Sequence, residues 1–277
     1  MTDEKQIFWN LPAKPALDPA ISNLPVFEKK LYNIQTNWST FREAAVTSES
    51  VLQLLQNQIP VIREKEFLTQ DECQRLLEIT KSHKIGSYNL QNTWPRLGKV
   101  GVTHFDYLND KDGYFEVALE ARALQGRWKT EAGIDILQRV AEMLHGKTGL
   151  PVEVAREHDG REYFAGIVRA SDAGIDVHAD NALYETPEWS VGAIEGQLTW
   201  NILLNEVPGG ETLIYDRLWE APDDDIAWRT TQHSHTYQKE MLEGRPFKSF
   251  TSDSSSAIAF VRLSTVPGTS QSLALSS

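Results

Sequence analysis

A histidine and an aspartate stand two positions apart in the run 177–181, which reads Val-His-Ala-Asp-Asn. The run closes a β-patterned segment, so the imidazole of His178 and the carboxylate of Asp180 can reach one metal ion. Two histidines and one carboxylate hold ferrous iron on one face and leave the other face open for cosubstrate and oxygen. The pair therefore predicts two ligands of an iron(II) site.

The third ligand has more than one candidate. We predict His235, from a polar stretch that also contains His233 and follows an acidic loop. A rival arrangement uses a second His-x-Asp pair, His104 and Asp106, with His178 as the third ligand. With 7 histidines and 39 acidic residues among 277, about one such pair arises by chance, so the spacing alone does not show which pair binds a metal. The alternative for each of these histidines is that it binds no metal and is an ordinary solvated side chain of a loop.

Two kinds of element must position these side chains. Helical periodicity predicts helices over 48–58, 69–82, 114–124 and 135–145. Thr69 and Glu72 form a capping box at the start of the second helix. Strands are expected over 59–63, 100–105, 163–169, 175–178, 197–204, 211–215, 257–261 and 273–275. The Pro-Gly-Gly turn at 208–210 predicts that the strands on either side of it pair as a hairpin.

Helices first and many short strands after are typical of an α+β protein. We predict a double-stranded β-helix (jelly roll) core with packed N-terminal helices. A single domain would span 1–277, with an N-terminal arm over 1–45, a mainly helical part over 46–150 and the jelly-roll core over 151–277. Residues at strand ends, such as His178, point into the mouth of such a roll, where pockets form.

Composition and charge narrow the class of partner. Lys and Arg number 27 against 39 Asp and Glu, a formal net charge of −12. Because nucleic acids and anionic membranes require a basic patch, we expect neither as a partner. Cys73 is the single cysteine, which excludes an internal disulfide and fits a reducing compartment. Neither a secretory signal nor an apolar run of roughly 20 residues is visible, so we expect a cytoplasmic protein.

Four stretches carry a family resemblance: 144–153, 167–169, 177–181 and 207–215, the last reading Val-Pro-Gly-Gly-Glu-Thr-Leu-Ile-Tyr. In order and spacing they resemble the iron(II)/2-oxoglutarate-dependent oxygenases. The likeness is closest to a branch of freestanding small-molecule hydroxylases and halogenases, and it covers the chain from about 60 to about 220. The resemblance implies a jelly roll in which His178, Asp180 and a distal histidine hold iron(II), with 2-oxoglutarate as cosubstrate.

The resemblance also bears on the reaction and the pocket. In halogenating relatives a small residue replaces the metal-binding carboxylate, and chloride fills the gap. Because Asp180 is a full carboxylate, we favour hydroxylation or desaturation of a small organic molecule in specialised metabolism. From strand position, three residues are expected to face the cosubstrate pocket: Arg169, Asn201 and Thr212. Tyr163 and Trp200 are expected either to line the pocket or to belong to the core.

The C-terminal residues depart from the family pattern. Family members carry a distal histidine and then an arginine for the far carboxylate of 2-oxoglutarate, where this chain has 261–266 and Ser272. Three interpretations stay open. The C-terminus is altered relative to an active parent, or His235 or its neighbour supplies the third ligand while Arg262 or Arg169 holds the cosubstrate. Alternatively, the protein has lost oxygenase chemistry and is a binding module or a non-oxidative isomerase or cyclase. Substrate identity and oligomeric state are left open.

Overall fold

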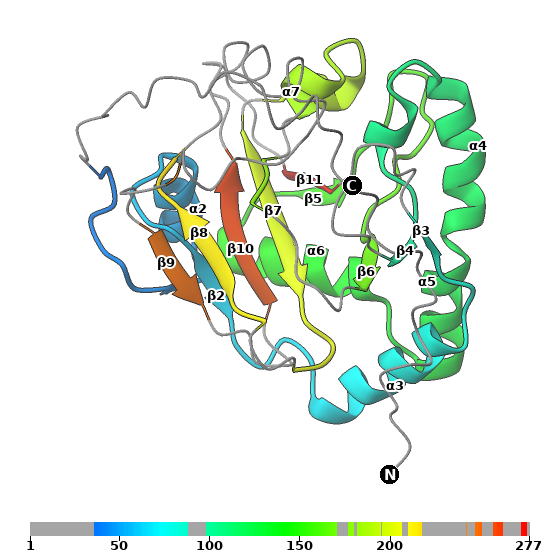
Figure 1. The fold of residues 1–277 in the computed structure, drawn as a ribbon, viewed down its shortest axis with the longest axis horizontal. Helices are drawn as coiled ribbons and strands as arrows, with labels where there is room; N and C mark the ends of the chain where they lie inside the picture. The colour runs from blue at the N-terminus through cyan, green and yellow to red at the C-terminus, as the bar shows by residue number, and fades with distance from the viewer. Residues whose placement is uncertain are drawn as a thin grey trace, which may run out of the picture. The chain divides into compact units, whose positions relative to one another are not determined.

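The computed structural model describes residues 36–87, 98–170, 177–179, 182–194, 196–206, 210–217, 242, 247–250, 257–262 and 273–275. They all belong to one compact unit, Ile34–Ser277. Helices and strands are mixed within this unit, as Figure 1 shows. The α+β class predicted from the sequence is therefore confirmed. Most of the predicted N-terminal arm lies outside the described residues.

The longer described helices lie before residue 150. They are α2 (Ser48–Leu55), α3 (Gln70–Lys81), α4 (Lys111–Ala121), α5 (Ala123–Arg127) and α6 (Ile136–Thr148). The other described helical segments are η2 (His104–Tyr107), η3 (Trp128–Ala132), α7 (Ala182–Glu185) and η4 (Ser190–Gly192). The capping box of α3 is confirmed, because the Thr69 hydroxyl accepts from the Glu72 N–H at 3.2 Å and the Glu72 carboxylate accepts from the Thr69 N–H at 2.8 Å. Two backbone donors at the helix start are satisfied in this way.

Two glycines explain where observed elements differ from predicted ones. The helix predicted to stop near residue 146 runs on as α6 to Gly149, whose φ of 73° is the left-handed conformation of a helix cap. Gly101 has a φ of 120°, and a side chain there would collide with the ring of Phe164. The strand predicted over 100–105 is therefore wrong beyond Val100, and η2 follows instead.

The described strands are short and form small sheets. They are β1 (Ala44–Ala45), β2 (Ile62–Glu64), β3 (Gly86–Ser87), β4 (Gly98–Val100), β5 (Val152–Val154), β6 (Val168–Ala170), β7 (Gln197–Ile202), β8 (Thr212–Tyr215), β9 (Phe247–Phe250), β10 (Ala257–Arg262) and β11 (Leu273–Leu275). The sheet orders are β1-β2-β10-β7, β3-β4-β6, β11-β5 and β8-β9. The strands predicted at 197–204, 211–215, 257–261 and 273–275 are confirmed, whereas the strand predicted over 163–169 is present only as β6.

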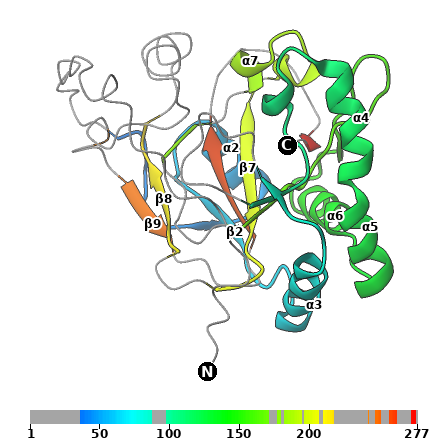
Figure 2. The ribbon, with the colours of Figure 1, turned by 45° about the vertical axis from the view of Figure 1, so that its right-hand side comes forward.

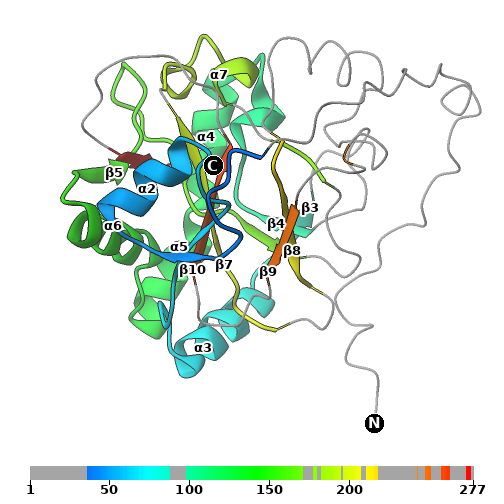
Figure 3. The same cartoon turned by 90° about the vertical axis from the view of Figure 1, so that its left-hand side faces the viewer.

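The predicted hairpin between β7 and β8 is wrong. β7 pairs antiparallel with β10 along its whole length, and β8 pairs antiparallel with β9. The connection 203–211 is longer than a tight hairpin turn, and Figures 2 and 3 show the β8–β9 ribbon on the opposite side of β10 and β7 from α6. None of the described sheets closes into a barrel, so the jelly roll stays a prediction.

The strands present one apolar face and one polar face. A core cluster with members from α2, α3, α5 and α6 covers the apolar face, which includes Val100, Val168, Leu198, Trp200 and Ile202. Trp200 is thus a core residue. Because successive side chains of a strand point to opposite faces, the intervening residues lie on the side away from these helices. We call this side of each of the two sheets the polar sheet face; its residues are Lys99 and Arg169 in the sheet β3-β4-β6, and Gln197, Thr199 and Asn201 in the sheet β1-β2-β10-β7.

Glu72 also joins α3 to α6. The Arg139 guanidinium donates to both carboxylate oxygens, at 2.9 and 2.8 Å. Hydrogen bonding by Arg139 is the main cause that lowers the pKa of Glu72 to about 2; burial opposes it, and the Thr69 N–H adds to it. Because the folded-state pKa is depressed, the stabilisation is complete above the unfolded pKa of about 4.3 and is lost as pH falls through about 2.

Glu72→Gln is expected to lower the free energy of unfolding at pH 7 by about 1–2 kcal/mol, because a helix cap and a bidentate ionic contact are both weakened. The difference from wild type should shrink at pH 3, where the unfolded carboxyl is already protonated. Urea unfolding at the two pH values measures both effects. Glu78→Gln on the same helix is the control, because it removes a carboxylate that accepts from the neutral Gln74 amide. If Glu78→Gln lowered the free energy of unfolding as much as Glu72→Gln does, the stabilising role assigned to Glu72 would be contradicted.

Candidate functional site

His178 is the predicted ligand that lies in the described part of the chain. Its side chain is half-buried and its backbone forms a β-bridge. Ala179, which follows it, is 7% exposed, and Ala182, which begins α7, is 4% exposed. Asp180 and His235, like the other histidine of that loop, lie outside the described residues. Ala179 and Ala182 are therefore buried and Val177, which precedes the pair, is half-buried, which a solvated surface loop would not require.

A side chain of β7 holds the backbone just past this pair. Gln197 lies on the polar sheet face, and its Oε1 accepts the N–H of Ala182 at 3.0 Å. Ala182 stands two positions after Asp180 in the sequence. Gln197 was not among the predicted site residues, because a glutamine at the start of a strand belongs to no motif. Only the pairing of distant segments reveals it.

A buried carboxylate holds the far end of the segment 182–192. Glu157 accepts from the Ser190 hydroxyl at 2.6 Å, from the Ser190 N–H at 3.2 Å and from the Tyr163 hydroxyl at 2.5 Å. The Lys111 ammonium lies 3.2 Å from the same carboxylate. Glu157 is 6% exposed, so these contacts replace its water. Sequence patterns give no signal for Glu157, since its partners come from three separate parts of the chain.

The pKa values in this group follow from burial and hydrogen bonding. Burial raises the pKa of Glu157, but hydrogen bonds from Ser190, Tyr163 and the His158 N–H outweigh it and hold that pKa well below its usual range. Burial, and then the Glu157 carboxylate, raise the pKa of Tyr163. Tyr163 is fully buried and packs against the ring of Phe115 at a centroid distance of 5.1 Å. It therefore belongs to the core.

The three residues predicted to face the cosubstrate lie in three different sheets. Arg169 is exposed in β6, and its partner in the strand register is Lys99 of β4. Asn201 is exposed in β7, and Thr212 is half-buried at the start of β8. Arg169 therefore belongs to the sheet β3-β4-β6, Asn201 to the sheet β1-β2-β10-β7 and Thr212 to the ribbon β8-β9, so the sheet pairing does not join the three residues.

The rival metal site is not formed. The Lys99 ammonium pairs with the Asp106 carboxylate, and the two side chains are 11% and 10% exposed. His104 is buried, at 8% exposure. Although His104, Asp106 and His178 are all described, no group of three or more His, Cys, Asp or Glu side chains within the described ranges could hold a metal ion. The arrangement of these three residues as ligands is therefore wrong.

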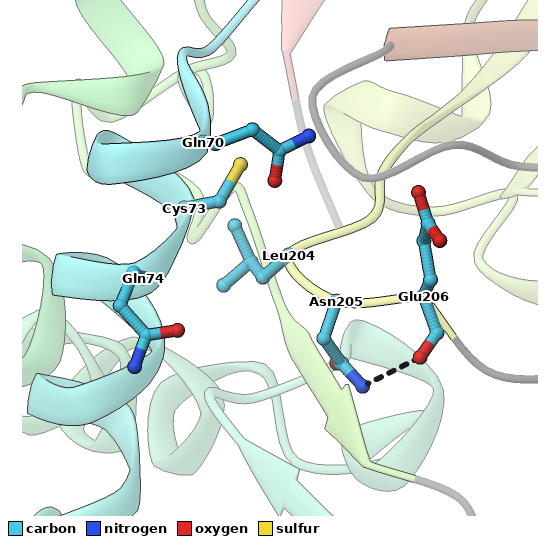
Figure 4. Close-up of a pocket in the computed structure, with 6 residues that line it drawn as sticks. All are labelled: Gln70, Cys73, Gln74, Leu204, Asn205 and Glu206. Atoms are coloured by element: carbon cyan, nitrogen blue, oxygen red, sulfur yellow. Dashed lines mark hydrogen bonds between the residues drawn. The ribbon is translucent and has the colours of Figure 1, made fainter.

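A pocket of about 330 Å³ lies elsewhere, between α3 and the end of β7 (Figure 4). Its lining consists of Gln70, Cys73, Gln74, Leu204, Asn205 and Glu206. None of the predicted ligands or cosubstrate residues belongs to this lining. Burial, and then the neighbouring Glu72 carboxylate, raise the pKa of the Cys73 thiol, so it is not an activated nucleophile.

A His-x-Asp pair with buried neighbours, beside a helix-backed sheet with a polar face, fits the iron(II)/2-oxoglutarate-dependent oxygenases. Imidazole and carboxylate are donors that suit ferrous iron. The family model described as carrier-protein-independent halogenase WelO5 matches residues 36–260, well over half of the chain. The chain belongs to this family, whose cofactors are iron(II) and 2-oxoglutarate.

One curated relative is similar over part of its length. The chain is 40% identical over 162 residues to the leucinostatins biosynthesis cluster protein S of Purpureocillium lilacinum. The match covers 58% of this chain and 66% of that relative, so the chain spans just under two thirds of the relative's length. Among the described residues, no helix has the length and apolar character needed to cross a membrane.

Glu157→Gln is expected to lower the free energy of unfolding by about 3 kcal/mol at pH 7, because the neutral amide cannot accept from every donor and leaves Lys111 without its buried counter-charge. Tyr163→Phe removes one donor and should cost about 1 kcal/mol. Urea unfolding followed by tryptophan fluorescence measures both losses. Glu153→Gln at an exposed position of β5 is the matched control, and a loss there as large as that of Glu157→Gln would contradict the role of the buried carboxylate.

Proposed function

We propose that this protein is an iron(II)/2-oxoglutarate-dependent oxygenase that hydroxylates or desaturates a small organic molecule in specialised metabolism. His178, Asp180 and His235 would hold the iron within a single jelly-roll domain. The family match supports this, as does the likeness to a protein from a biosynthesis cluster. Because the family model describes a carrier-protein-independent enzyme, we infer a free substrate rather than one tethered to a carrier. The observation that carries the proposal is the burial of Ala179, which stands between the two proposed ligands in the sequence, and of Ala182, two positions after them.

The residues of the chain have separate tasks in this proposal. When bound, iron(II) with 2-oxoglutarate would use molecular oxygen as the oxidant that removes hydrogen from an unactivated carbon. His178 would hold the metal through a neutral imidazole nitrogen, and Asp180 through its carboxylate. Ala179 and Ala182, both buried and apolar, exclude water from the backbone beside the metal ligands.

The cosubstrate carries two carboxylates, and Arg169 is an exposed cation of β6. A planar guanidinium suits a carboxylate bidentately, whereas the register partner Lys99 already pairs with Asp106. We propose that Arg169 takes over the task of the family's C-terminal arginine, with Asn201 contributing from β7. Thr212 would contribute from the second layer of the jelly roll, on β8.

Asp180 decides between oxygenation and halogenation in this proposal. A carboxylate ligand occupies the coordination position that chloride requires, so we assign hydroxylation or desaturation although the family model describes a halogenase. In this proposal, the side chain at position 180 determines whether the enzyme oxygenates or halogenates its substrate.

A non-oxidative jelly-roll protein is the second candidate, and the C-terminal sequence favours it. The family match ends at residue 260, and no histidine follows His235. A chain with His178 and Asp180 alone would bind iron weakly, because each missing ligand removes a coordination bond. Such a protein would act as a binding module or as an isomerase or cyclase.

Anaerobic addition of iron(II) and 2-oxoglutarate should give the wild-type protein the weak visible charge-transfer band of the chelate. His178→Ala, Asp180→Ala and His235→Ala should each weaken iron binding by about 10-fold or more. His233→Ala is the matched control within the same loop and should keep the band. A wild-type protein without the band at saturating 2-oxoglutarate would support the non-oxidative candidate instead.

Chloride should leave the visible band of the wild-type chelate unchanged, because Asp180 fills the position that a halide would take. Asp180→Gly opens that position, and chloride should then shift the band. Anaerobic titration with sodium chloride, with sodium sulfate at equal ionic strength as the control, measures the difference. A chloride-dependent shift in the wild-type protein would contradict the assignment of Asp180 as a ligand.

A further inference from the structure

The backbone that follows the proposed ligands is held to β7 by one side chain. The Gln197 Oε1 accepts the Ala182 N–H at 3.0 Å, although the two residues are 15 positions apart. Ala182 is 4% exposed, so its N–H has lost bulk water and depends on a protein acceptor. The hydrogen bond therefore fixes the chain at a point two residues past Asp180.

The rest of the segment 182–192 cannot easily move to compensate. The Ala182 carbonyl accepts from the Thr186 N–H at 3.0 Å and from the Thr186 hydroxyl at 3.2 Å. A side chain at Gly192 would collide with the carbonyl oxygen of Thr186, so the turn is closely packed. Ser190 is bound twice by the Glu157 carboxylate. With the far end held, the Gln197 hydrogen bond controls where the near end lies.

We infer that Gln197 is a positioning residue for the metal centre: by accepting the Ala182 N–H, its side chain supports the backbone of the segment that supplies the proposed ligands. This inference rests on the proposed function, since it takes His178 and Asp180 as iron ligands. Gln197 touches neither iron nor substrate in this role. It acts through the backbone, as residues that orient metal ligands from outside the coordination sphere do.

Removal of the acceptor should weaken iron binding while the protein stays folded. Gln197→Leu and the nearly isosteric Gln197→Met should raise the iron(II) dissociation constant by roughly 10- to 100-fold and change the intensity of the visible chelate band. Gln197→Glu keeps an acceptor oxygen and should remain within about threefold of wild type. Gln138→Leu, which removes an exposed glutamine that bonds Glu142 on α6, should leave iron binding unchanged.

The donor can be removed as well. Ala182→Pro deletes the N–H at the first position of α7, a place where proline is tolerated in helices. If both substitutions act by removing this one hydrogen bond, their effects should not add. The double variant Ala182→Pro with Gln197→Leu should then bind iron(II) no more weakly than whichever single variant has the lower iron affinity. Additive losses would show that the two residues act separately and would overturn the inference.

The outcomes separate this inference from the proposed function. If Asp180→Ala binds iron as tightly as wild type, the proposed function fails. If Asp180→Ala loses iron while Gln197→Leu and Gln197→Met bind it normally, only the positioning role fails. Thermal unfolding of every variant shows which ones are folded. Should both apolar variants be unfolded, Gln197→Glu decides, because a folded Gln197→Glu protein that has lost iron affinity contradicts the inference.

Discussion

The two-residue period of β7 is the constraint on which the candidate site depends. Alternate residues of this strand pack on the helix-covered core, so the residues between them must face the other way. That alternation brings Gln197 to the side where it meets Ala182. A shift of one residue in the register of β7 against β10 would bury these polar side chains among the helices and expose the core.

A second polar framework holds the chain beyond α7, and it centres on Glu157. Glu157 is surrounded by donors that satisfy it, and a buried carboxylate of this kind contributes chiefly by fixing one arrangement of its neighbours. Its partners come from α4, η4 and the chain after β5. The segment after the His-x-Asp pair is thus held at both ends, which suits a centre whose ligands must keep their geometry.

Local signals in the sequence predicted a large part of the fold. The Thr69–Glu72 cap, the periodicity of α3 and the strands β7, β8 and β10 depend on residues close together in the chain. The predictions that failed concern elements that depend on distant partners. The strand predicted over 100–105 ends at Gly101, where the Phe164 ring leaves no room for a side chain. The predicted hairpin does not form, because β7 pairs with β10 rather than with β8. The candidate site divides in the same way, because a His-x-Asp spacing is visible in a sequence and the hydrogen bond that Gln197 accepts from Ala182 is not.

The place of β10 in its sheet has a consequence for how the chain reaches this structure. β10 comes from residues 257–262, yet it lies between β2 and β7 and bonds to both. During synthesis, β2 and β7 therefore emerge before the strand that joins them, and their inner edges stay open until residues 257–262 have been made. Open edges of this kind invite pairing with other chains, and contacts between residues so far apart form slowly. The nascent protein thus depends on β10 to cover two edges that would otherwise be open to aggregation.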